Sequence, residues 1–439
     1  MTTAAEFASR RPFYAWFVVA LLALANCVSF IDRLLLSLVV APIKTELQLA
    51  DWQVGLLQGL AFATFYCVIG LAVARIADIA SRKWIITAGV SLWCVMTALT
   101  AMARSFGQLF VTRAGVAVGE ATLTPATHAL LAGYFPRERL ALAIGIYSAG
   151  VTAGMGLAYL VGGAAINWVG TLGSVDVPLL GTLSGWRLVF ALVGALGLPV
   201  AVATLAVVEP TRPIDHKAAP IRQVFGHFRL HLADYGLVFA GYGATTITVY
   251  AFVYWAPTFF QRHYHTSITV AASLLGTAAL IGGLLGAFCG GALSDRLERA
   301  GDHCAKLRVL WWCCAGLVAP TIVAPFMPSA EACAAVLSLT FFFGSASTGP
   351  AGAYVQSITP QTMRAQFGAA YQLSLTLVGA VLGPFAVAAF TDFVFQDESR
   401  VGWSLACVAA LANPMAAWLT WRAFMRARRA APALGSRSD

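Results

Sequence analysis

The sequence predicts an all-α membrane protein with twelve transmembrane helices in two pseudo-symmetric six-helix bundles. Three observations indicate this fold: an apolar composition, long apolar runs that recur along the chain, and a loop motif present in both halves. Of the 439 residues, 59% are hydrophobic and 11% are Asp, Glu, Lys or Arg, and the mean hydropathy is +0.77. Because a soluble globular chain carries about 25% charged residues, the composition excludes an ordinary soluble protein.

The apolar runs are long enough to cross about 30 Å of hydrocarbon at about 1.5 Å per helical residue. We expect spans at residues 13–41, 52–74, 84–103, 107–132, 139–166, 186–208, 232–260, 268–293, 308–328, 332–358, 365–390 and 402–421. The first run follows Arg10 and Arg11, but it is too long for the apolar region of a signal peptide, so we interpret it as a retained helix. The runs 139–166 and 332–358 are rich in Gly, Ala and Ser, which favours close helix packing.

Positive charges are distributed unevenly between the two sides of the predicted membrane. With the N-terminus inside, the inner segments hold 21 Lys and Arg, the outer segments hold five, and two lie within spans. Cytoplasmic loops carry such an excess, so we expect both termini in the cytoplasm and place the chain in a bacterial inner membrane. The basic tail from Arg422 to Arg429 fits contact with anionic membrane lipids better than a nucleic-acid site.

A loop motif occurs at equivalent places in the two halves. ARIADIASRK (residues 74–83) follows the second span, and GALSDRLERA (residues 291–300) follows the eighth. Asp78 and Asp295 are therefore 217 residues apart, close to half the chain. This repeat divides the chain into an N-terminal six-helix bundle at 1–208, a cytoplasmic linker at 209–231, and a C-terminal six-helix bundle with a basic tail at 232–439. Parallel repeats around a midplane site are a recurring transporter plan.

GALSDRLERA resembles the signature that follows helices 2 and 8 in the major facilitator superfamily. The first copy departs from that signature at Ala74, Ile79 and Ser81. In the superfamily these loops close the cytoplasmic side of the outward-facing state. The resemblance therefore implies four gating residues: Asp78, Arg82, Asp295 and Arg296. The alternative is that these residues only anchor loops and contribute to the positive-inside bias.

Shorter motifs resemble one branch of that superfamily. RAGVAVGEA (residues 113–121) is similar to the R-x-x-x-G-x-G-x-A element of helix 4, with Ala117 in place of the first Gly. The Ile-Asp-Arg of helix 1, the Gly-Glu-Ala of helix 4 and the Trp-Ala-Pro-Thr at 255–258 resemble the spinster-like branch. That branch is associated with sphingosine phosphate and lysophospholipids and with proton-linked mechanisms. The resemblance implies a secondary transporter of lipid-like molecules.

Four ionisable residues lie deep inside apolar runs of the first third of the chain: Asp32, Arg33, Arg113 and Glu120. An ionisable group in a membrane is costly and is a functional hypothesis by default. Arg113 and Glu120 are seven residues apart, close to two helical turns, so they share one helix face. Asp32 has a depth comparable to that of Arg113, and we expect these two to be in contact, with Glu120 one layer deeper. Arg33 points about 100° away from Asp32 and need not face the same cavity.

A carboxyl group that is alternately hydrated, paired with Arg and sealed from water can change its protonation with conformation. Our hypothesis is that Asp32 and Glu120 form a coupled proton site, with Arg113 as the partner that competes with the proton. One alternative is a static ion pair that fixes helix 1 against helix 4. Another, compatible with proton coupling, is that Arg33 or Arg113 binds a phosphate or carboxylate of the substrate.

The apolar stretches of the second half, from about Leu237 to Trp421, carry no ionisable residue deep inside them but offer neutral polar groups. We predict that the substrate contacts Arg33 and Arg113 in the first half and the following residues in the second: Thr246, Tyr250, Tyr254 and Gln372. A charged side facing an apolar side with hydroxyls suits an amphipathic molecule with a polar head and a long tail. The alternative for the second-half residues is hydrogen bonding between helices.

Other functional classes find little support in the sequence. It contains no phosphate-binding P-loop, no Cys or His spacing typical of a metal site, and no nucleophile with a partner base, so we predict neither an enzyme nor a cofactor. We expect a monomeric carrier whose partners are protons, membrane lipids and a small amphipathic substrate, with no nucleic acid. The competing predictions are a proton-linked multidrug or organic-acid carrier, an intramembrane lipid-modifying enzyme, and a membrane sensor without transport activity.

Overall fold

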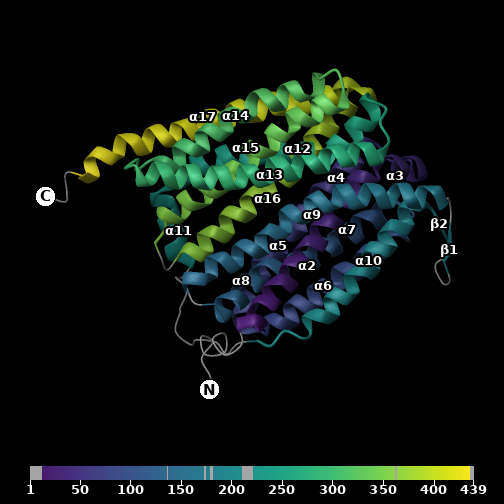
Figure 1. Cartoon of the computed structure of the whole chain (residues 1–439), viewed down its shortest axis with the longest axis horizontal. Coiled ribbons are helices and arrows are strands. Elements are labelled where there is room, and N and C mark those ends of the chain that lie inside the picture. Colours follow the sequence, from purple (N-terminus) through teal and green to yellow (C-terminus); the bar gives the residue numbers. More distant parts are fainter. Residues whose placement is uncertain are drawn as a thin grey trace. The chain divides into compact units, whose positions relative to one another are not determined.

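The computed structural model describes residues 12–135, 137–172, 175–177, 181–209, 221–360 and 363–435, nearly all of them helical. The chain forms two compact units (Figure 1). Unit 1 comprises residues up to 216 together with 267–276, and unit 2 comprises 217–266 and 277–439. Within the described residues, eleven helices are long and apolar enough to cross a membrane by length and composition. The predicted all-α membrane fold is confirmed.

Unit 1 is built from helices that follow the predicted spans closely. Its described elements are α2 (Pro12–Leu38), α3 (Val40–Leu47), α4 (Asp51–Gln58), α5 (Leu60–Ile79), α6 (Arg82–Thr100), α7 (Phe106–Glu120), α8 (Leu123–Tyr134), α9 (Arg137–Leu172), β1 (Val175–Val177), β2 (Gly181–Leu183) and α10 (Gly185–Thr204). The strands form a small antiparallel pair in which Asp176 lies opposite Thr182. The sequence did not predict this hairpin, because each strand is only three residues long.

Two predicted spans of unit 1 are broken near their middle. The run 52–74 divides into α4 and α5 at Gly59, whose backbone angles (φ −101°, ψ −82°) are not helical. The run 107–132 divides into α7, of 15 residues, and α8, of 12 residues, directly after Glu120. Neither α7 nor α8 alone is long enough to span, so this pair accounts for the twelfth expected crossing. Broken helices recur at the binding sites of transporters.

Gly89 explains how α6 approaches the break between α7 and α8. A Cβ atom on Gly89 would lie 1.8 Å from Oγ1 of Thr122 and 2.7 Å from the carbonyl oxygen of Gly119. The Thr122 hydroxyl in turn donates to the Gly119 carbonyl oxygen at 2.9 Å. Because the two backbones are this close, only glycine fits at position 89, and the break is held firmly against α6.

The apolar core of unit 1 gathers near its two ends. One cluster includes Leu35, Val39, Leu57, Leu109 and Phe190, and it lies where α2 ends and where α4 and α7 begin. We name this the outer end, following the predicted topology. The second cluster lies toward the opposite end and joins the first half of α2 to α6 and α8. The ionisable residues of the first third lie between these two apolar layers.

Unit 2 repeats the helical plan. Its described elements are α11 (Ile221–Leu230), α12 (Leu232–His263), α13 (Ile268–Arg299, shared with unit 1 at its start), α14 (Ala305–Val323), η1 (Ala324–Phe326), α15 (Ala330–Ser357), α16 (Arg364–Ala389), η3 (Phe390–Phe395), η4 (Glu398–Arg400) and α17 (Val401–Gly435). Helix α11 lies within the predicted linker 209–231, of which residues 210–220 are outside the described part. Ser329 begins α15 by accepting a hydrogen bond from the backbone N–H of Ala332 at 3.2 Å.

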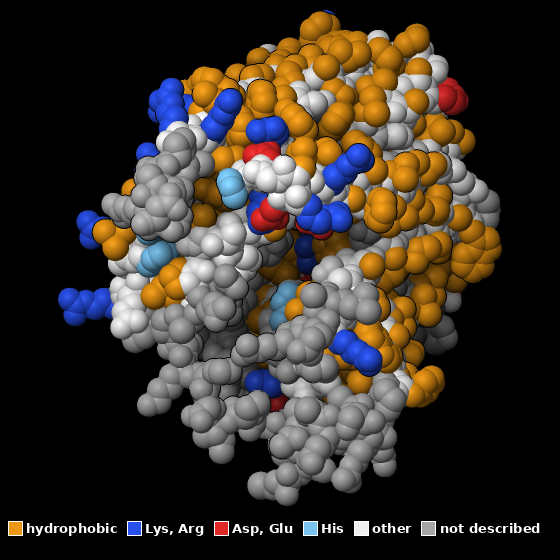
Figure 2. Space-filling view, turned by 60° about the vertical axis from the view of Figure 1, so that its left-hand side comes forward, with side chains coloured by type: hydrophobic (Ala, Val, Ile, Leu, Met, Phe, Trp, Pro, Cys, Tyr) orange, Lys and Arg blue, Asp and Glu red, His pale blue; other side chains and the backbone are white. Residues whose placement is uncertain are grey.

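Large apolar side chains remain exposed on the helices of both units, among them Val111, Leu196, Phe288 and Leu411. Figure 2 shows hydrophobic side chains over broad areas of one face of the molecule. A soluble monomer rarely exposes apolar patches of this extent. The surface is therefore that of a protein whose helices face lipid.

Candidate functional site

The four ionisable residues predicted from the sequence are all buried in unit 1. Asp32 and Arg33 come from α2, and Arg113 and Glu120 come from α7, whose first turn is capped by the Ser105 hydroxyl. None of the four ionisable residues is more than 6% exposed. Removing charges from water costs several kcal/mol for each ion unless a partner compensates. The partners of these four groups therefore decide what the site can do.

The four residues form two ion pairs between α2 and α7. Both Nη2 and Nε of Arg33 donate to Oε2 of Glu120, at 2.6 Å and 3.2 Å. Nη1 of Arg113 lies 3.4 Å from Oδ1 of Asp32, and the Thr97 hydroxyl of α6 donates to Oδ2 of Asp32 at 2.5 Å. The predicted contact between Asp32 and Arg113 is confirmed. Each carboxylate thus has a guanidinium of its own.

The contact between Arg33 and Glu120 differs from the expectation that Arg33 need not face the same cavity. Successive residues of a helix do point about 100° apart, but that angle ignores the length of the side chain. A helical side chain also leans toward the N-terminus of its own helix, so the guanidinium of Arg33 lies deeper than its Cα atom. It therefore reaches Glu120, which is two turns beyond Arg113 on α7.

Aromatic rings surround the guanidinium groups. The Cζ atom of Arg33 lies 4.4 Å from the ring centroid of Phe30, 4.3 Å from that of Phe62 and 5.1 Å from that of Tyr66. Cζ of Arg113 lies 6.0 Å from the same Phe62 ring. A desolvated cation–π contact is worth about 2 kcal/mol, so these rings help to hold both cations in the apolar interior. Phe62 and Tyr66 were not predicted, although their i, i+4 spacing in the second span was a usable signal.

Hydrogen-bonding capacity is left over in this cluster. Oε1 of Glu120 and Nε of Arg113 are buried and have no hydrogen-bond partner among the described residues. A buried polar atom without a partner costs about 1–3 kcal/mol. The two ion pairs are therefore incompletely satisfied, and they retain atoms that can bind a proton, a water molecule or a substrate group.

The predicted substrate-binding residues of unit 2 lie in different environments. The Thr246 hydroxyl donates to the carbonyl oxygens of Gly243, at 2.7 Å, and Leu375, at 3.3 Å. Tyr250 and Tyr254 stack with their ring centroids 6.1 Å apart, and Tyr254 is buried. Gln372 is exposed on α16. The contacts of Thr246 favour the packing alternative for that residue.

The four predicted gating residues lie near helix ends. In unit 1, Nη1 of Arg82 donates to the carbonyl oxygen of Ala129 at 2.9 Å, which joins α6 to α8. In unit 2, Asp295 and Arg296 are exposed near the end of α13. The side chain of Asp78 lies outside the described residues.

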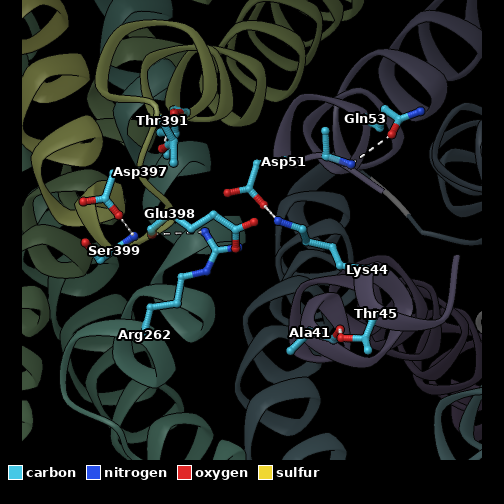
Figure 3. A network of polar contacts seen from close by, with 12 residues as sticks. Ala41, Lys44, Thr45, Asp51, Gln53, Arg262, Thr391, Asp397, Glu398 and Ser399 are labelled. Atoms are coloured by element: carbon cyan, nitrogen blue, oxygen red, sulfur yellow. Dashed lines mark hydrogen bonds and ion pairs between the residues drawn. The ribbon is translucent and has the colours of Figure 1, made fainter. Parts of the chain in front are cut away.

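Polar contacts at the helix ends of each unit were not predicted. In unit 1, Lys44 bonds Asp51, which joins α3 to α4; in unit 2, Nη2 of Arg262 lies 2.7 Å from Oε2 of Glu398 (Figure 3). Asp397 accepts hydrogen bonds from Ser399, and these lower the pKa of its carboxyl group.

Glu46 of α3 makes the most extensive of these end contacts. It accepts hydrogen bonds from Ser184 at 2.8 Å, Trp186 at 2.5 Å and Arg187 at 2.8 Å. Partial burial alone would raise the pKa of Glu46, but the three hydrogen bonds outweigh burial and lower it. The carboxylate of Glu46 therefore joins α3 to the start of α10 in its charged form.

Comparison with known proteins adds independent findings. The family model of the Major Facilitator Superfamily matches residues 22–384. An MFS-type efflux pump of Mycolicibacterium smegmatis is 28% identical over 95% of this chain and 94% of its own. Protein spinster homolog 1 of Bos taurus is 23% identical over 87% of this chain and 74% of its own. The crystal structure of a bacterial homolog to the human lysosomal transporter Spinster, in an inward-facing and unoccupied conformation, is 26% identical, has a TM-score of 0.76, and covers 94% of this chain and 97% of its own.

Proposed function

Since this chain belongs to the major facilitator superfamily and resembles its spinster-like branch, we propose that it couples proton movement to the transport of an amphipathic organic anion. The transporter class follows from the family. The coupling ion and the substrate are what we propose. Alternating access would proceed by rocking of the two six-helix halves around a midplane site. Asp78, Arg82, Asp295 and Arg296 would then act at the cytoplasmic gate of a monomer with both termini inside.

One observation carries the proposal: the buried carboxylates of Asp32 and Glu120 are each paired with a buried guanidinium, and the two pairs retain unsatisfied atoms. A proton and a guanidinium compete for the same carboxylate, because protonation removes the charge that the guanidinium stabilises. Protonation of Glu120 would therefore release Arg33. The loss of the Glu120 charge beside the buried guanidinium would favour binding of an anion there.

This competition fixes the sign of coupling for an anionic substrate. A phosphate or carboxylate head that binds Arg33 or Arg113 displaces the protein carboxylate, which then gains affinity for a proton. Binding of an anion should therefore be accompanied by proton uptake. Arg suits phosphate and carboxylate because its planar guanidinium can donate two parallel hydrogen bonds. The neutral interior of unit 2, with Thr246, Tyr250 and Tyr254, would receive the apolar tail.

A proton-linked multidrug carrier is the second candidate, and the likeness to an efflux pump over 95% of this chain favours it. A cationic drug would compete with protons for Asp32 and Glu120 directly. Its binding would therefore release protons, whereas binding of an anion takes them up. The sign of the proton change on binding separates the two functions.

Transport into proteoliposomes under an imposed pH gradient tests the proposal. The probes are lysophosphatidylglycerol, which is anionic and amphipathic, and a cationic dye. Glu120→Gln should abolish pH-driven uptake of the lysolipid while thermal-shift measurements still detect its binding. Glu298→Gln is the matched control, because Glu298 pairs with Lys306 at 2.6 Å on the exposed end of unit 2. Proton-driven flux that survives in Glu120→Gln would refute the coupling role.

A further inference from the structure

Gln58 is a buried polar residue that the two ion pairs do not use. It ends α4, directly before the break at Gly59, and it is 2% exposed. Neither Nε2 nor Oε1 of its amide has a hydrogen-bond partner among the described residues. Two unsatisfied atoms on one buried amide set Gln58 apart from the other partly satisfied groups of unit 1.

The position of Gln58 links the ion pairs to the outer end of unit 1. Gln58 lies seven residues after the start of α4, and Arg113 lies seven residues after the start of α7, so both are about 10 Å from that end. Val54 and Leu57 of α4 join Leu109 of α7 in the apolar cluster of the outer end. Gln58 is therefore the next residue inward from an apolar layer.

Phe62 lies beside the charged groups on the inner side. It follows Gln58 by four residues across the break at Gly59, and its ring lies 6.0 Å from Cζ of Arg113. Arg113 pairs with Asp32 through Nη1, whereas its Nε is buried without a partner among the described residues. A donor on Arg113 and both amide atoms of Gln58 are therefore unsatisfied at the same depth.

The energetics argue that the Gln58 amide has a small polar ligand. Burying an amide without a hydrogen bond is unfavourable, because the group loses its hydrogen bonds to water and gains none in return. Leucine at this position would extend the apolar layer of Leu57 without that cost. A water molecule typically makes about three hydrogen bonds to buried polar groups that are otherwise unsatisfied. The amide oxygen offers an acceptor to such a water and Nε of Arg113 offers a donor, which leaves one lone pair of the water for the Asp32 carboxyl group.

We propose that Gln58 is a positioning residue for proton exchange at Asp32, holding an ordered water beside the Asp32–Arg113 pair. The inference rests on the proposed proton coupling. In this step the O–H bond of protonated Asp32 breaks as an O–H bond forms on the water, and one of the water's own O–H bonds breaks to return a proton to the other carboxyl oxygen. Both groups are again neutral after the exchange. The Gln58 carbonyl oxygen accepts a hydrogen bond from the water and fixes its orientation.

Hydrogen exchange at the Asp32 carboxyl group tests the proposal without any substrate. Infrared difference spectra of the lipid-reconstituted protein, at an acidic pH where the carboxyl is protonated, record its C=O band after transfer to D₂O. Asp32→Asn assigns the band. Gln58→Leu should slow the shift of this band about tenfold, which corresponds to about 1.4 kcal/mol in the barrier. Gln58→Met, which is similar in volume, is the second variant if Gln58→Leu does not fold.

Thr340→Val is the matched control, because the Thr340 hydroxyl of unit 2 is also buried and without a partner among the described residues. It should leave the exchange of the Asp32 carboxyl unchanged. If Gln58→Leu or Gln58→Met exchanges as fast as the wild type, the water assignment is overturned. Because the measurement uses no substrate, that result would not affect the transport proposal. Conversely, a transport measurement that refutes proton coupling would leave the exchange rates of the Asp32 carboxyl interpretable.

Discussion

The two units bury different kinds of polar group. Unit 1 holds every charged residue that is buried within the described part of the chain: Asp32, Arg33, Asp51, Arg113, Glu120 and Arg187. The buried polar residues of unit 2 are neutral there, all of them Ser, Thr or Asn. A representative contact is the one between Nδ2 of Asn413 and Oγ1 of Thr321, at 2.7 Å.

This difference indicates that the buried charges of unit 1 are not needed for the fold. Unit 2 packs long helices of the same kind without a buried charged residue in its described part, and its buried contacts include hydroxyl and amide hydrogen bonds. Buried ion pairs are often no more stabilising than apolar residues of the same volume. The two ion pairs between α2 and α7 therefore carry a stability cost that function has to explain.

Arg33→Leu should lower the free energy of unfolding more than the other variants below. It leaves the Glu120 carboxylate buried without its guanidinium, and breaking a buried pair in this way costs about 3–5 kcal/mol. Chemical unfolding of the purified protein measures the change. The double variant Arg33→Leu/Glu120→Leu should recover most of the lost stability while pH-driven transport remains absent. If the double variant stays as unstable as the single one, the pair is structural and the contrast between the units fails.

Phe62→Leu should destabilise unit 1 by about 2 kcal/mol, because the ring contacts both Arg33 and Arg113. It should also shift the pH dependence of transport, since the cations lose a stabilising neighbour. Phe341→Leu in unit 2 is the control, a buried aromatic residue of α15. A pH profile that moves equally in both variants would show that the effect comes from packing alone.

Asn413→Leu removes one hydrogen bond, worth about 1 kcal/mol, but also removes the buried Oδ1, which has no partner among the described residues, so the stability of unit 2 should fall by less than about 1 kcal/mol. The hydroxyl of Thr321 keeps a second contact, donating to the carbonyl oxygen of Leu317 at 2.6 Å. We expect unchanged proton coupling in vesicles, because no charge is involved. A change in the number of protons moved per substrate would place part of the coupling in unit 2.

Glu46→Gln should lower the thermal stability least among these variants, and it should do so only above acidic pH. The pKa of Glu46 is lowered in the folded protein, so its stabilising contribution is fully present above its unfolded value, near 4.5. That contribution is lost as the pH falls through the lower folded pKa. Thermal unfolding should therefore show a wild-type advantage at neutral pH that disappears in acid. An advantage that grows on acidification would contradict the assignment.

The sequence predicted much of this architecture because long apolar runs are a strong signal of membrane-spanning helices. It also predicted the contact between Asp32 and Arg113, since helix depth follows from residue number. The contact between Arg33 and Glu120 was missed because an angle between neighbouring residues says little about where a long side chain ends. The break after Glu120 depends on a tertiary contact between Gly89 and Thr122, which no local pattern shows.

The unsatisfied amide of Gln58 was equally beyond sequence reasoning. A single glutamine in an apolar run can pair with a neighbouring helix, face solvent or remain unsatisfied, and only packing distinguishes these cases. For the second-half hydroxyls, the sequence left two readings open. Thr246 shows why, because a threonine that bonds a backbone carbonyl and one that binds substrate look alike in sequence.

We propose that the carboxylates of Asp32 and Glu120 exchange their guanidinium partners for protons. The most direct measurement of this exchange is the proton change when purified protein binds lysophosphatidylglycerol in weakly buffered solution. We predict proton uptake by the wild type and by Glu298→Gln, and a large loss of that uptake in Glu120→Gln. Uptake in Glu120→Gln equal to that of the wild type would contradict the account.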